Sequence, residues 1–316
     1  MTKEGSAMEK NYTFYKATYP SSDGQNTIVF YRYVPRETAP RAILQISHGM
    51  CEYIGRYEPF ADYLCGLGYV VAGNDHLGHG ETAKNEADLG FTGGAECLVD
   101  DLYRLTERLK EEHPELPVVL FGHSMGSFVV RRYLEKYPDA ADAAIISGTG
   151  GPDSPTGFGK LLTRTLMLFH GERYRSAFVK NVAFMGYNKH FESENCKDAW
   201  ISRDREIVAR YGKDPLCQFT FTLRGYYDLF ELLGKVSKKT WAGKLKKDLP
   251  ILMISGDDDP VGSYGVGVKK IYDRMLAAEM SDVTLRLYEG ARHEVLNETN
   301  RVEVFADIAA WLAEKI

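Results

Sequence analysis

The sequence predicts an α/β protein in which a mostly parallel sheet carries helices on both faces. From residue 42 onward, short apolar runs recur along the chain, and most are separated by stretches with helical spacing. Alternation of this kind is typical of a parallel sheet covered by helices. The length of 316 residues is near the upper limit for one continuous core. We therefore expect one large domain with an insertion.

The strands are expected in a simple order, beginning with an antiparallel hairpin. Residues 12–19 and 27–34 alternate in polarity around a Ser-Ser-Asp-Gly turn. The apolar runs that follow are AILQIS (42–47), YVVAG (69–73), PVVLFG (117–122), AAIIS (143–147), PILMIS (250–255) and VTLRLY (283–288). Two helices are indicated by apolar stripes, one through Leu98, Leu102, Leu105 and Leu109 and one through Phe305, Ile308, Ala309 and Leu312.

Residues 150–245 interrupt the alternation. They contain no strand-like run, and helical segments rich in Phe, Leu, Met and Tyr follow a Gly/Pro-rich opening. This pattern predicts a helical cap over 150–245, inserted in a core formed by 1–149 and 246–316. The apolar residues between Phe158 and Phe191 are suited to lining an acyl tunnel or to packing the cap on the core, and the sequence leaves both uses open.

Composition and charge exclude several classes of function. A formal net charge of -5 gives no concentrated basic face, so we expect no nucleic-acid partner. No run of about 18 apolar residues is present, so no transmembrane segment is expected. The opening MTKEGSAMEK lacks the apolar centre of a secretory signal, and a cytoplasmic location is the expectation. The basic cluster Lys235–Lys247 is interpreted as solvated surface, with contact to anionic lipid as the alternative.

The cysteines point to free thiols and not to a metal site. They are five in number and scattered, without the spacing of a zinc site or a redox pair. Cys51 falls in a loop that we assign to the active site, yet a bystander role is expected for it. No metal is expected.

The strongest functional signal is a Gly-x-Ser-x-Gly motif placed between a strand and a helix. Gly122 and Gly126 flank Ser124 directly after the apolar run 117–122 and before a helical segment. A sharp strand-to-helix turn leaves no room for side chains at the flanking positions and lifts the serine hydroxyl clear of the backbone. The helix also aims free N–H groups at the same spot. Ser124 is therefore the predicted nucleophile.

A serine hydroxyl needs a base, and in such an arrangement the base lies in a loop after the last strand. Among the eight histidines, His293 alone lies between the strand 283–288 and the final helix. A carboxylate must then fix the imidazole tautomer from the end of a strand between the serine and the histidine. Asp257, Asp258 and Asp259 all satisfy that condition, and the residues alone do not choose among them.

An oxyanion hole needs two preorganised donors. The first is expected to be the backbone N–H of Met125, the residue after the nucleophile. The second is expected from Met50, in a loop that follows the strand 42–47. His48 in that loop is expected to tie the loop down and not to take part in the chemistry.

Together, the segments HGMCEYIGRY, NDHLGHGET, GHSMGS, SGDDDPVG and EGARHEVLNE resemble the monoacylglycerol lipase and lysophospholipase branch of the α/β hydrolases. The resemblance covers most of the chain outside the cap. It implies the eight-stranded α/β-hydrolase fold, the triad Ser124, Asp259 and His293, the oxyanion donors Met50 and Met125, and no cofactor. A second family motif, formed by Asp75, His76, Gly78, His79 and Gly80, is expected to brace loops near the site.

The favoured function is hydrolysis of a carboxylic ester through an acyl-enzyme, with a small acyl ester or lipid as substrate and transient contact of the cap with a membrane surface. The runner-up is a serine aminopeptidase or amidase, for which Glu172, Glu192 and Glu194 could hold a free amine. A non-catalytic binding protein is less favoured, because nothing would keep the triad complete. An aspartate nucleophile is excluded by Ser124.

Overall fold

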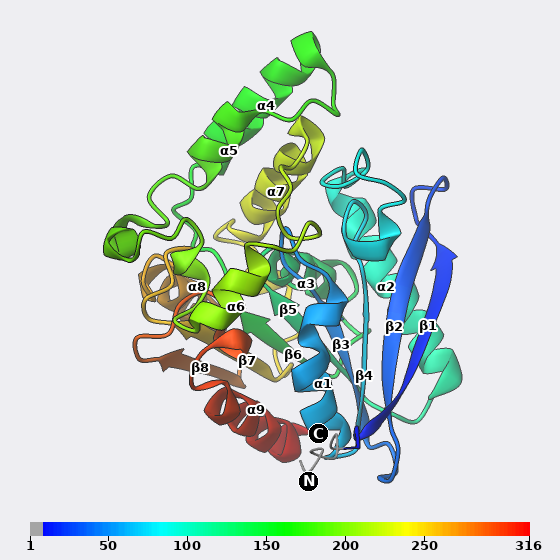
Figure 1. Cartoon of the computed structure of the whole chain (residues 1–316). Coiled ribbons are helices and arrows are strands. Elements are labelled where there is room, and N and C mark those ends of the chain that lie inside the picture. The colour runs from blue at the N-terminus through cyan, green and yellow to red at the C-terminus, as the bar shows by residue number, and fades with distance from the viewer. Residues whose placement is uncertain (1–8) are drawn as a thin grey trace, which may run out of the picture.

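The computed structural model describes residues 9–316, and it contains one sheet of eight strands in the order β1-β2-β4-β3-β5-β6-β7-β8 (Figure 1). The strands are β1 (Tyr12–Pro20), β2 (Thr27–Pro35), β3 (Ala42–Ser47), β4 (Tyr69–Asn74), β5 (Val118–His123), β6 (Ala143–Ser147), β7 (Ile251–Gly256) and β8 (Val283–Tyr288). Each predicted strand is present within one residue of its expected ends. The predicted α/β-hydrolase fold is confirmed.

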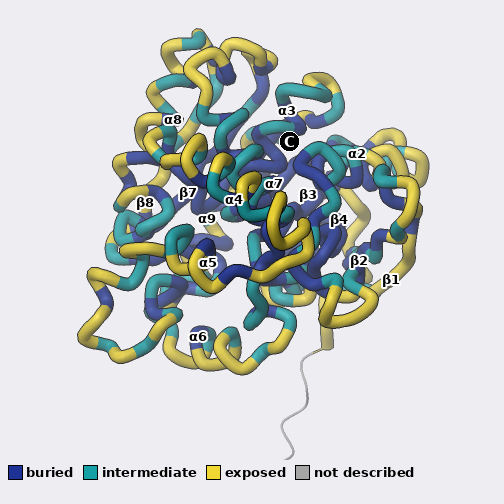
Figure 2. The backbone as a smooth tube through the Cα atoms, turned by 90° about the horizontal axis from the view of Figure 1, so that it is seen from above, coloured by how far each residue is buried: buried dark blue, intermediate teal, exposed yellow. Residues whose placement is uncertain are grey.

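Within the sheet, β2 is the strand that runs opposite to the other seven. β1 pairs antiparallel with β2, and β2 pairs antiparallel with β4, whereas every pair from β4 to β8 is parallel. The strands β3 to β7 are buried along their whole length, which is why they read as unbroken apolar runs. Viewed from above, buried residues gather in the middle of the molecule and exposed residues lie mostly around its edge (Figure 2).

Helices cover both faces of the sheet, as predicted. On one face α2 (Ala95–Glu112), α3 (Met125–Lys136) and α8 (Val266–Ala277) contribute to one apolar cluster. On the other face α1 (Glu58–Cys65) and α9 (Arg301–Lys315) contribute to a second cluster. The leucine stripe of residues 98–109 lies in α2 and the stripe of 305–312 in α9, so both helix predictions are confirmed.

The chain between β6 and β7 is helical and lies at the end of the sheet where the parallel strands finish (Figure 1). Its helices are α4 (Thr156–His170), α5 (Ala177–Ala183), α6 (Arg205–Tyr211) and α7 (Leu223–Val236), with short 3-10 turns between them. No strand occurs from residue 150 to 245. The treatment of 150–245 as a separate cap domain stays a prediction, because the end of α7 packs into the core cluster through Leu232 and Val236.

Among residues 9–316, no helix has both the length and the apolar character needed to cross a bilayer.

Candidate active site

The serine turn is built by close backbone contacts. β5 ends at His123, Ser124 has a left-handed φ of 52°, and α3 begins at Met125. A Cβ atom at Gly126 would lie 2.0 Å from the carbonyl oxygen of Ser47, and one at Gly122 would lie 2.6 Å from the carbonyl oxygen of Gly126. Only glycine fits at either position. The half-exposed Ser124 is thereby held in a backbone conformation that non-glycine residues rarely adopt.

Two further side chains meet Ser124 from distant parts of the chain. The loop after β8 places His293 Nε2 2.9 Å from Ser124 Oγ. The loop after β7 places Asp259 so that its Oδ2 is 3.0 Å from His293 Nδ1 and its Oδ1 is 3.1 Å away. Both partners are buried, with His293 3% and Asp259 0% exposed. The geometry is that of a nucleophile, a base and an orienting carboxylate.

Of the three adjacent aspartates, Asp259 is the one whose carboxylate contacts the histidine. Asp257 accepts a hydrogen bond of 2.6 Å from the backbone N–H of Gly290. Asp258 is half-exposed, and its backbone N–H donates to Ala291. Asp259 is also held by the N–H of Val261, 2.9 Å from Oδ1.

Two opposing effects act on the imidazole. Burial lowers the pKa of His293, but the adjacent Asp259 carboxylate and the more distant Glu294 and Glu52 more than offset it. The net pKa of His293 is therefore above its ordinary value. This balance stabilises the imidazolium that forms when His293 takes a proton.

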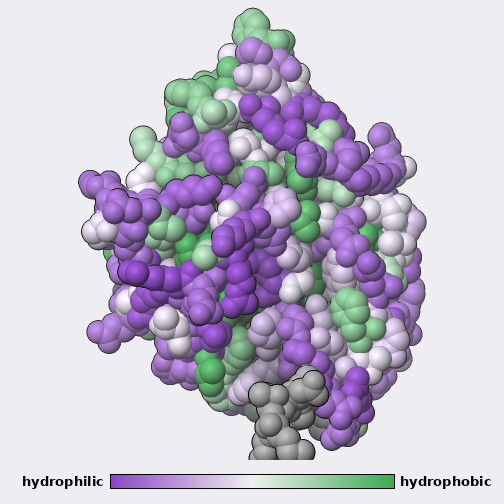
Figure 3. Space-filling view, viewed as in Figure 1, coloured by the Kyte–Doolittle hydropathy of each residue, from purple (hydrophilic) through white to green (hydrophobic). Residues whose placement is uncertain are grey.

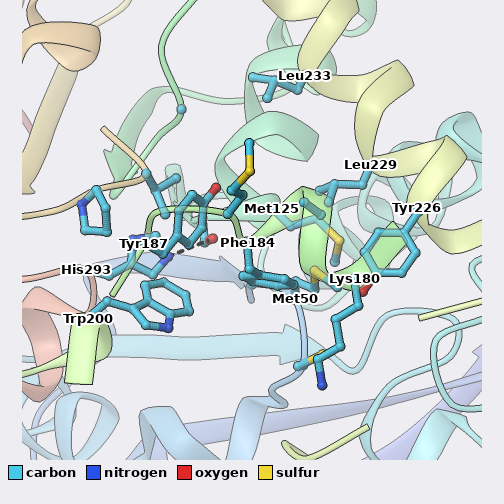
Figure 4. A pocket seen from close by; sticks show the side chains of 18 of the residues that line it. Met50, Met125, Lys180, Phe184, Tyr187, Trp200, Tyr226, Leu229, Leu233 and His293 are labelled. Atoms are coloured by element: carbon cyan, nitrogen blue, oxygen red, sulfur yellow. Dashed lines mark hydrogen bonds between the residues drawn. The ribbon is translucent and has the colours of Figure 1, made fainter. Parts of the chain in front are cut away.

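The loop after β3 passes directly beside the serine. A Cβ atom at Gly49 would lie 3.1 Å from the Cβ of Ser124. Met50 and Met125 both line the cavity (Figure 4). The role of their backbone N–H groups as oxyanion donors stays a prediction.

Histidines and an aspartate brace that loop from behind, as expected for the second motif. His48 Nε2 accepts a bond of 2.9 Å from the N–H of His76, whose own Nε2 lies 2.9 Å from Ser47 Oγ. Asp75 accepts from the N–H groups of Ile54 and Glu81, at 2.9 and 2.8 Å. His48 and His76 are fully buried, and burial lowers the pKa of His76 to about 3. They are neutral structural groups.

A buried ion network joins the serine side of the site to the histidine side. Arg56 forms a bidentate pair with Glu294, at 2.7 and 2.6 Å, and also bonds Glu52 at 2.9 Å. Glu52 in turn accepts from the N–H of Gly49 and from Tyr57 Oη. Because Glu294 follows the histidine directly, one guanidinium holds the loop after β3 against the loop after β8.

Sequence reasoning missed this network. Glu52 and Arg56 lie four residues apart in the quoted segment HGMCEYIGRY, and Glu294 lies in EGARHEVLNE. The spacing of Glu52 and Arg56 was an available signal for an ion pair. The pairing with Glu294 joins residues 238 positions apart, so no local pattern indicates it.

A cavity of about 680 Å³ opens above Ser124 (Figure 4). His293 lies with Trp200 and Tyr187 on one side, and Tyr226, Leu229 and Leu233 lie on the other (Figure 4). The volume is in the range of pockets that enclose a small organic ligand.

The apolar residues expected in the cap have three different surroundings. Phe158, Phe184, Met185 and Tyr187 line the cavity. Leu162, Leu166 and Met167 pack in a small cluster around Val179 and Phe221. Leu161, Leu168, Phe169 and Phe178 are exposed. Some of these residues therefore line the cavity, some pack the inserted segment, and some are exposed to solvent.

The acidic residues enlisted for an amine-binding site do not line the cavity. Glu194 pairs with Arg292, Glu172 pairs with Arg224 at 3.4 Å, and Glu192 is exposed. None of these three residues therefore supplies the acidic anchor that the aminopeptidase interpretation enlisted them for.

The five cysteines are free, as predicted. Cys51 and Cys217 line the cavity, but burial raises the pKa of the Cys51 thiol to about 12. A thiol so rarely ionised is a poor nucleophile, so the bystander interpretation of Cys51 holds. No group of three or more metal-ligating side chains occurs in the described part of the chain.

Comparison with known families assigns the chain. A family model described as "Serine aminopeptidase, S33" matches residues 38–300. The chain belongs to this family. The matched region includes Ser124, Asp259 and His293, and membership in this serine aminopeptidase family makes the chain a serine hydrolase, the predicted enzyme class.

Two curated relatives are lipases by name. A monoacylglycerol lipase of Mycolicibacterium smegmatis is 28% identical over 89% of this chain and 91% of its own length. The monoglyceride lipase of Homo sapiens is 28% identical over 93% and 89%. The predicted resemblance to this branch is confirmed.

Solved structures agree with the fold and the branch. A thermostable carboxyl esterase from Bacillus coagulans, in complex with glycerol, superposes with a TM-score of 0.89 at 30% identity, covering 95% of this chain and 98% of that one. A lipase in an open form superposes with a TM-score of 0.88 at 27% identity, covering 96% and 99%.

Replacing Arg56 with Met should destabilise the fold by about 3–5 kcal/mol, because Glu52 and Glu294 would be left as buried unpaired carboxylates. Burial already raises the pKa of Glu52 to about 7 even with Arg56 present. A carboxyl whose folded pKa lies above its unfolded value gains stability from protonation, so the loss should shrink as the pH falls from 8 to 5. Urea unfolding at both pH values measures this.

Arg210→Met is the matched control, since Arg210 and its partner Glu206 are 74% and 87% exposed. It should change stability by less than about 1 kcal/mol at either pH. Equal losses in the two variants would contradict a buried network that depends on Arg56.

Proposed function

We propose that this protein cleaves carboxylic esters by way of an acyl-enzyme on Ser124, with a monoacylglycerol or a similar lysolipid as substrate. The observation that carries the proposal is the 2.9 Å contact between Ser124 Oγ and His293 Nε2 at the floor of a largely apolar cavity. The relatives named as monoacylglycerol lipases support the substrate class.

The chemistry follows from the positions of the groups. Ser124 Oγ attacks the acyl carbon while its proton passes to His293 Nε2, and Asp259 stabilises the resulting imidazolium. The carbonyl oxygen becomes an oxyanion, which accepts hydrogen bonds from the N–H groups of Met50 and Met125. Collapse breaks the bond to the alcohol oxygen, which leaves with the proton from His293. Water then repeats the sequence, releasing the carboxylic acid and restoring Ser124.

The cavity fits an acyl chain on one side and a polar alcohol on the other. Tyr226, Leu229 and Leu233 form an apolar wall on the side away from His293 (Figure 4). Polar side chains such as Asn181 and Gln218 line other parts of the cavity. A few polar groups in an apolar lining orient a ligand that is mostly hydrocarbon.

Amide cleavage is not favoured by any contact in the cavity. Four acidic residues line it, and each already has a cationic partner. Asp153 pairs with Lys270, Asp198 with Lys197, and Glu52 and Glu294 with Arg56. A free ammonium would compete there with a guanidinium already held by strong bonds.

The exposed apolar side chains of α4 and α5 support contact with a membrane surface. Leu168 and Phe169 are 80% and 79% exposed, and Leu161 and Phe178 are exposed as well. Hydrophobic surface gathers at the end of the molecule where these helices lie (Figure 3). Patches of this kind mark interaction sites. A lipase with such a patch beside its cavity can take substrate from a lipid layer. The cytoplasmic location expected from the sequence stays a prediction.

The basic cluster Lys235–Lys247 is a weaker candidate for lipid contact. Lys235 bonds Glu96 and Glu231, and Lys244 pairs with Glu135. This pairing fits the interpretation of the cluster as solvated surface.

Ser124→Ala should abolish ester turnover, because no other group near His293 can form the acyl-enzyme. The measurement is hydrolysis of p-nitrophenyl esters from acetyl to palmitoyl, with 1-monoacylglycerols and aminoacyl anilides in parallel. Retained ester hydrolysis in Ser124→Ala would remove the serine mechanism. Anilide cleavage without ester cleavage by the native protein would move the assignment to a peptidase.

Asp259→Asn should lower kcat by roughly 10⁴-fold and move the acid limb of the pH profile to lower pH. The carboxylate raises the pKa of His293, and the base works only when neutral, so activity is lost as the pH falls through that pKa. Asp258→Asn is the adjacent control and should leave both kcat and the acid limb near those of the native protein. A matching effect in Asp258→Asn would contradict the role of Asp259.

Leu168→Ser with Phe169→Ser should weaken binding to phosphatidylcholine–phosphatidylglycerol vesicles about tenfold or more, because burying one such side chain contributes about 1.5–3 kcal/mol. Vesicle flotation measures this, and turnover of soluble p-nitrophenyl butyrate should not change. Val302→Ser is the control, since Val302 is 71% exposed on α9. Similar flotation of all three proteins would exclude the α4–α5 patch as a membrane contact.

A further inference from the structure

Arg131 is a buried cation without a carboxylate partner. It lies on α3, seven residues after Ser124, and its side chain is fully buried. Among residues 9–316 no Asp or Glu pairs with it. Burial lowers its pKa to about 9, so it is still charged near neutral pH. Such a group is costly to bury unless its hydrogen bonds are well placed.

The partners of Arg131 lie where the chain enters and leaves the inserted segment. On the entering side, Arg131 Nη1 donates to Thr149 Oγ1 at 3.1 Å and to the carbonyl of Gly150 at 3.4 Å. On the returning side, its Nη2 donates to the carbonyl of Val236 at 2.6 Å. The guanidinium also lies 4.4 Å from the ring of Trp241, whose indole N–H donates back to the carbonyl of Arg131.

The entering side is continuous with the nucleophile. Thr149 Oγ1 is 2.8 Å from Ser127 Oγ, and Ser127 Oγ is 2.5 Å from the carbonyl oxygen of Ser124. Each hydroxyl can donate one hydrogen, so a chain of bonds can run from Arg131 through Thr149 and Ser127 to the Ser124 carbonyl.

The returning side is the C-terminus of α7. Its last carbonyls accept from two core arginines, Val236 from Arg131 and Ser237 from Arg274, the latter at 2.6 Å. Cations at a helix C-terminus stabilise it through the helix dipole and satisfy carbonyls that have no partner within the helix. The same helix supplies Leu229 and Leu233 to the apolar wall of the cavity.

We propose that Arg131 is a positioning residue that fixes α7 against α3 and so sets the length of acyl chain that the cavity accepts. The inference rests on the proposed function, in which an acyl chain lies along the wall formed by Leu229 and Leu233. Phe128, one turn before Arg131 on α3, also lines this cavity, so α3 and α7 meet there. Arg131 does not touch the reacting atoms. It acts through the position of α7, and so it affects how substrates with long acyl chains are bound.

The test compares Arg131→Met with a matched change on the same helix. Tyr133→Phe removes one buried hydrogen bond, from Tyr133 Oη to Thr106 Oγ1 at 2.9 Å. This bond joins α3 to α2 and does not involve the inserted segment. Values of kcat and KM are measured for p-nitrophenyl esters from acetyl to palmitoyl, and stability is measured by urea unfolding. Native turnover must first be shown to vanish in Ser124→Ala.

For Arg131→Met we expect kcat/KM on decanoyl and longer esters to fall about tenfold or more, with acetyl ester turnover within about twofold of native. A small displacement of α7 lowers kcat/KM most for substrates that make many contacts with it. Tyr133→Phe should lower stability without changing the order of chain lengths. For Arg131→Lys, kcat/KM on long esters should lie between the native and Arg131→Met values. One ammonium cannot bond both where the chain enters the inserted segment and where it returns.

A loss in Arg131→Met by the same factor at every chain length would overturn the inference and leave a purely structural role, while the proposed function would stand. If Arg131→Met does not fold, Arg274→Met is the second test, because it frees only the Ser237 carbonyl. It must shift the profile in the same direction, and an unchanged profile there would also overturn the inference. Ester turnover that survives in Ser124→Ala would instead remove the proposed function itself.

Discussion

The close contact between the start of α3 and the end of β3 is the constraint on which the site depends. Gly126 lies so near the Ser47 carbonyl that a Cβ would come within 2.0 Å of it. This contact brings the loop that follows β3 beside Ser124, so the nucleophile and its expected oxyanion donors share one place. The parallel order of β5, β6, β7 and β8 then delivers Asp259 and His293 to the same edge. The close packing at Gly126 and the strand order together place the loops after β3, β7 and β8 around Ser124.

Around that constraint, the protein uses buried charge to hold loops that lack regular structure. Arg56 joins the loop after β3 to the loop after β8 through Glu52 and Glu294. Glu294 and Glu52 also add to the effect of Asp259 in raising the pKa of His293. The network therefore has an electrostatic consequence as well as a mechanical one. Removing a single member would alter both loop register and the proton affinity of the base.

How much could be predicted from the sequence depends on how local each signal is. Strands β3 to β7 are buried on both faces, so each one appears as an apolar run whose ends the sequence marks to within a residue. Ser124 and His293 could be predicted because the serine turn and the last loop have fixed places in the order of strands. Asp259 could not be separated from Asp257 and Asp258 without the family resemblance. The structure separates them because the side chain of Asp257 turns to Gly290.

What the sequence could not show are contacts between distant segments. Whether an apolar residue of α4 or α5 lines the cavity, packs inside or is exposed depends on which side of its helix faces the cavity. Helical spacing alone does not say where a cavity lies. Leu166 and Leu168 differ by two positions, yet the first packs inside and the second is exposed. The ion network of Arg56 likewise joins positions 238 apart.

The boundary between core and cap illustrates the same point. The expected boundary at residue 246 follows the return to strand-like sequence, whereas the packing changes earlier, within α7. Leu233 packs in the core cluster and lines the cavity. Leu229 is only partly buried against that cluster and also contacts the small cluster around Val179 and Phe221. One helix therefore belongs to both parts. The start of α4 packs on the C-terminal half of α7, where a Cβ atom at Gly234 would lie 3.2 Å from Thr156 Oγ1. The inserted segment is therefore joined to the core along α7 and not only where the chain enters and leaves it.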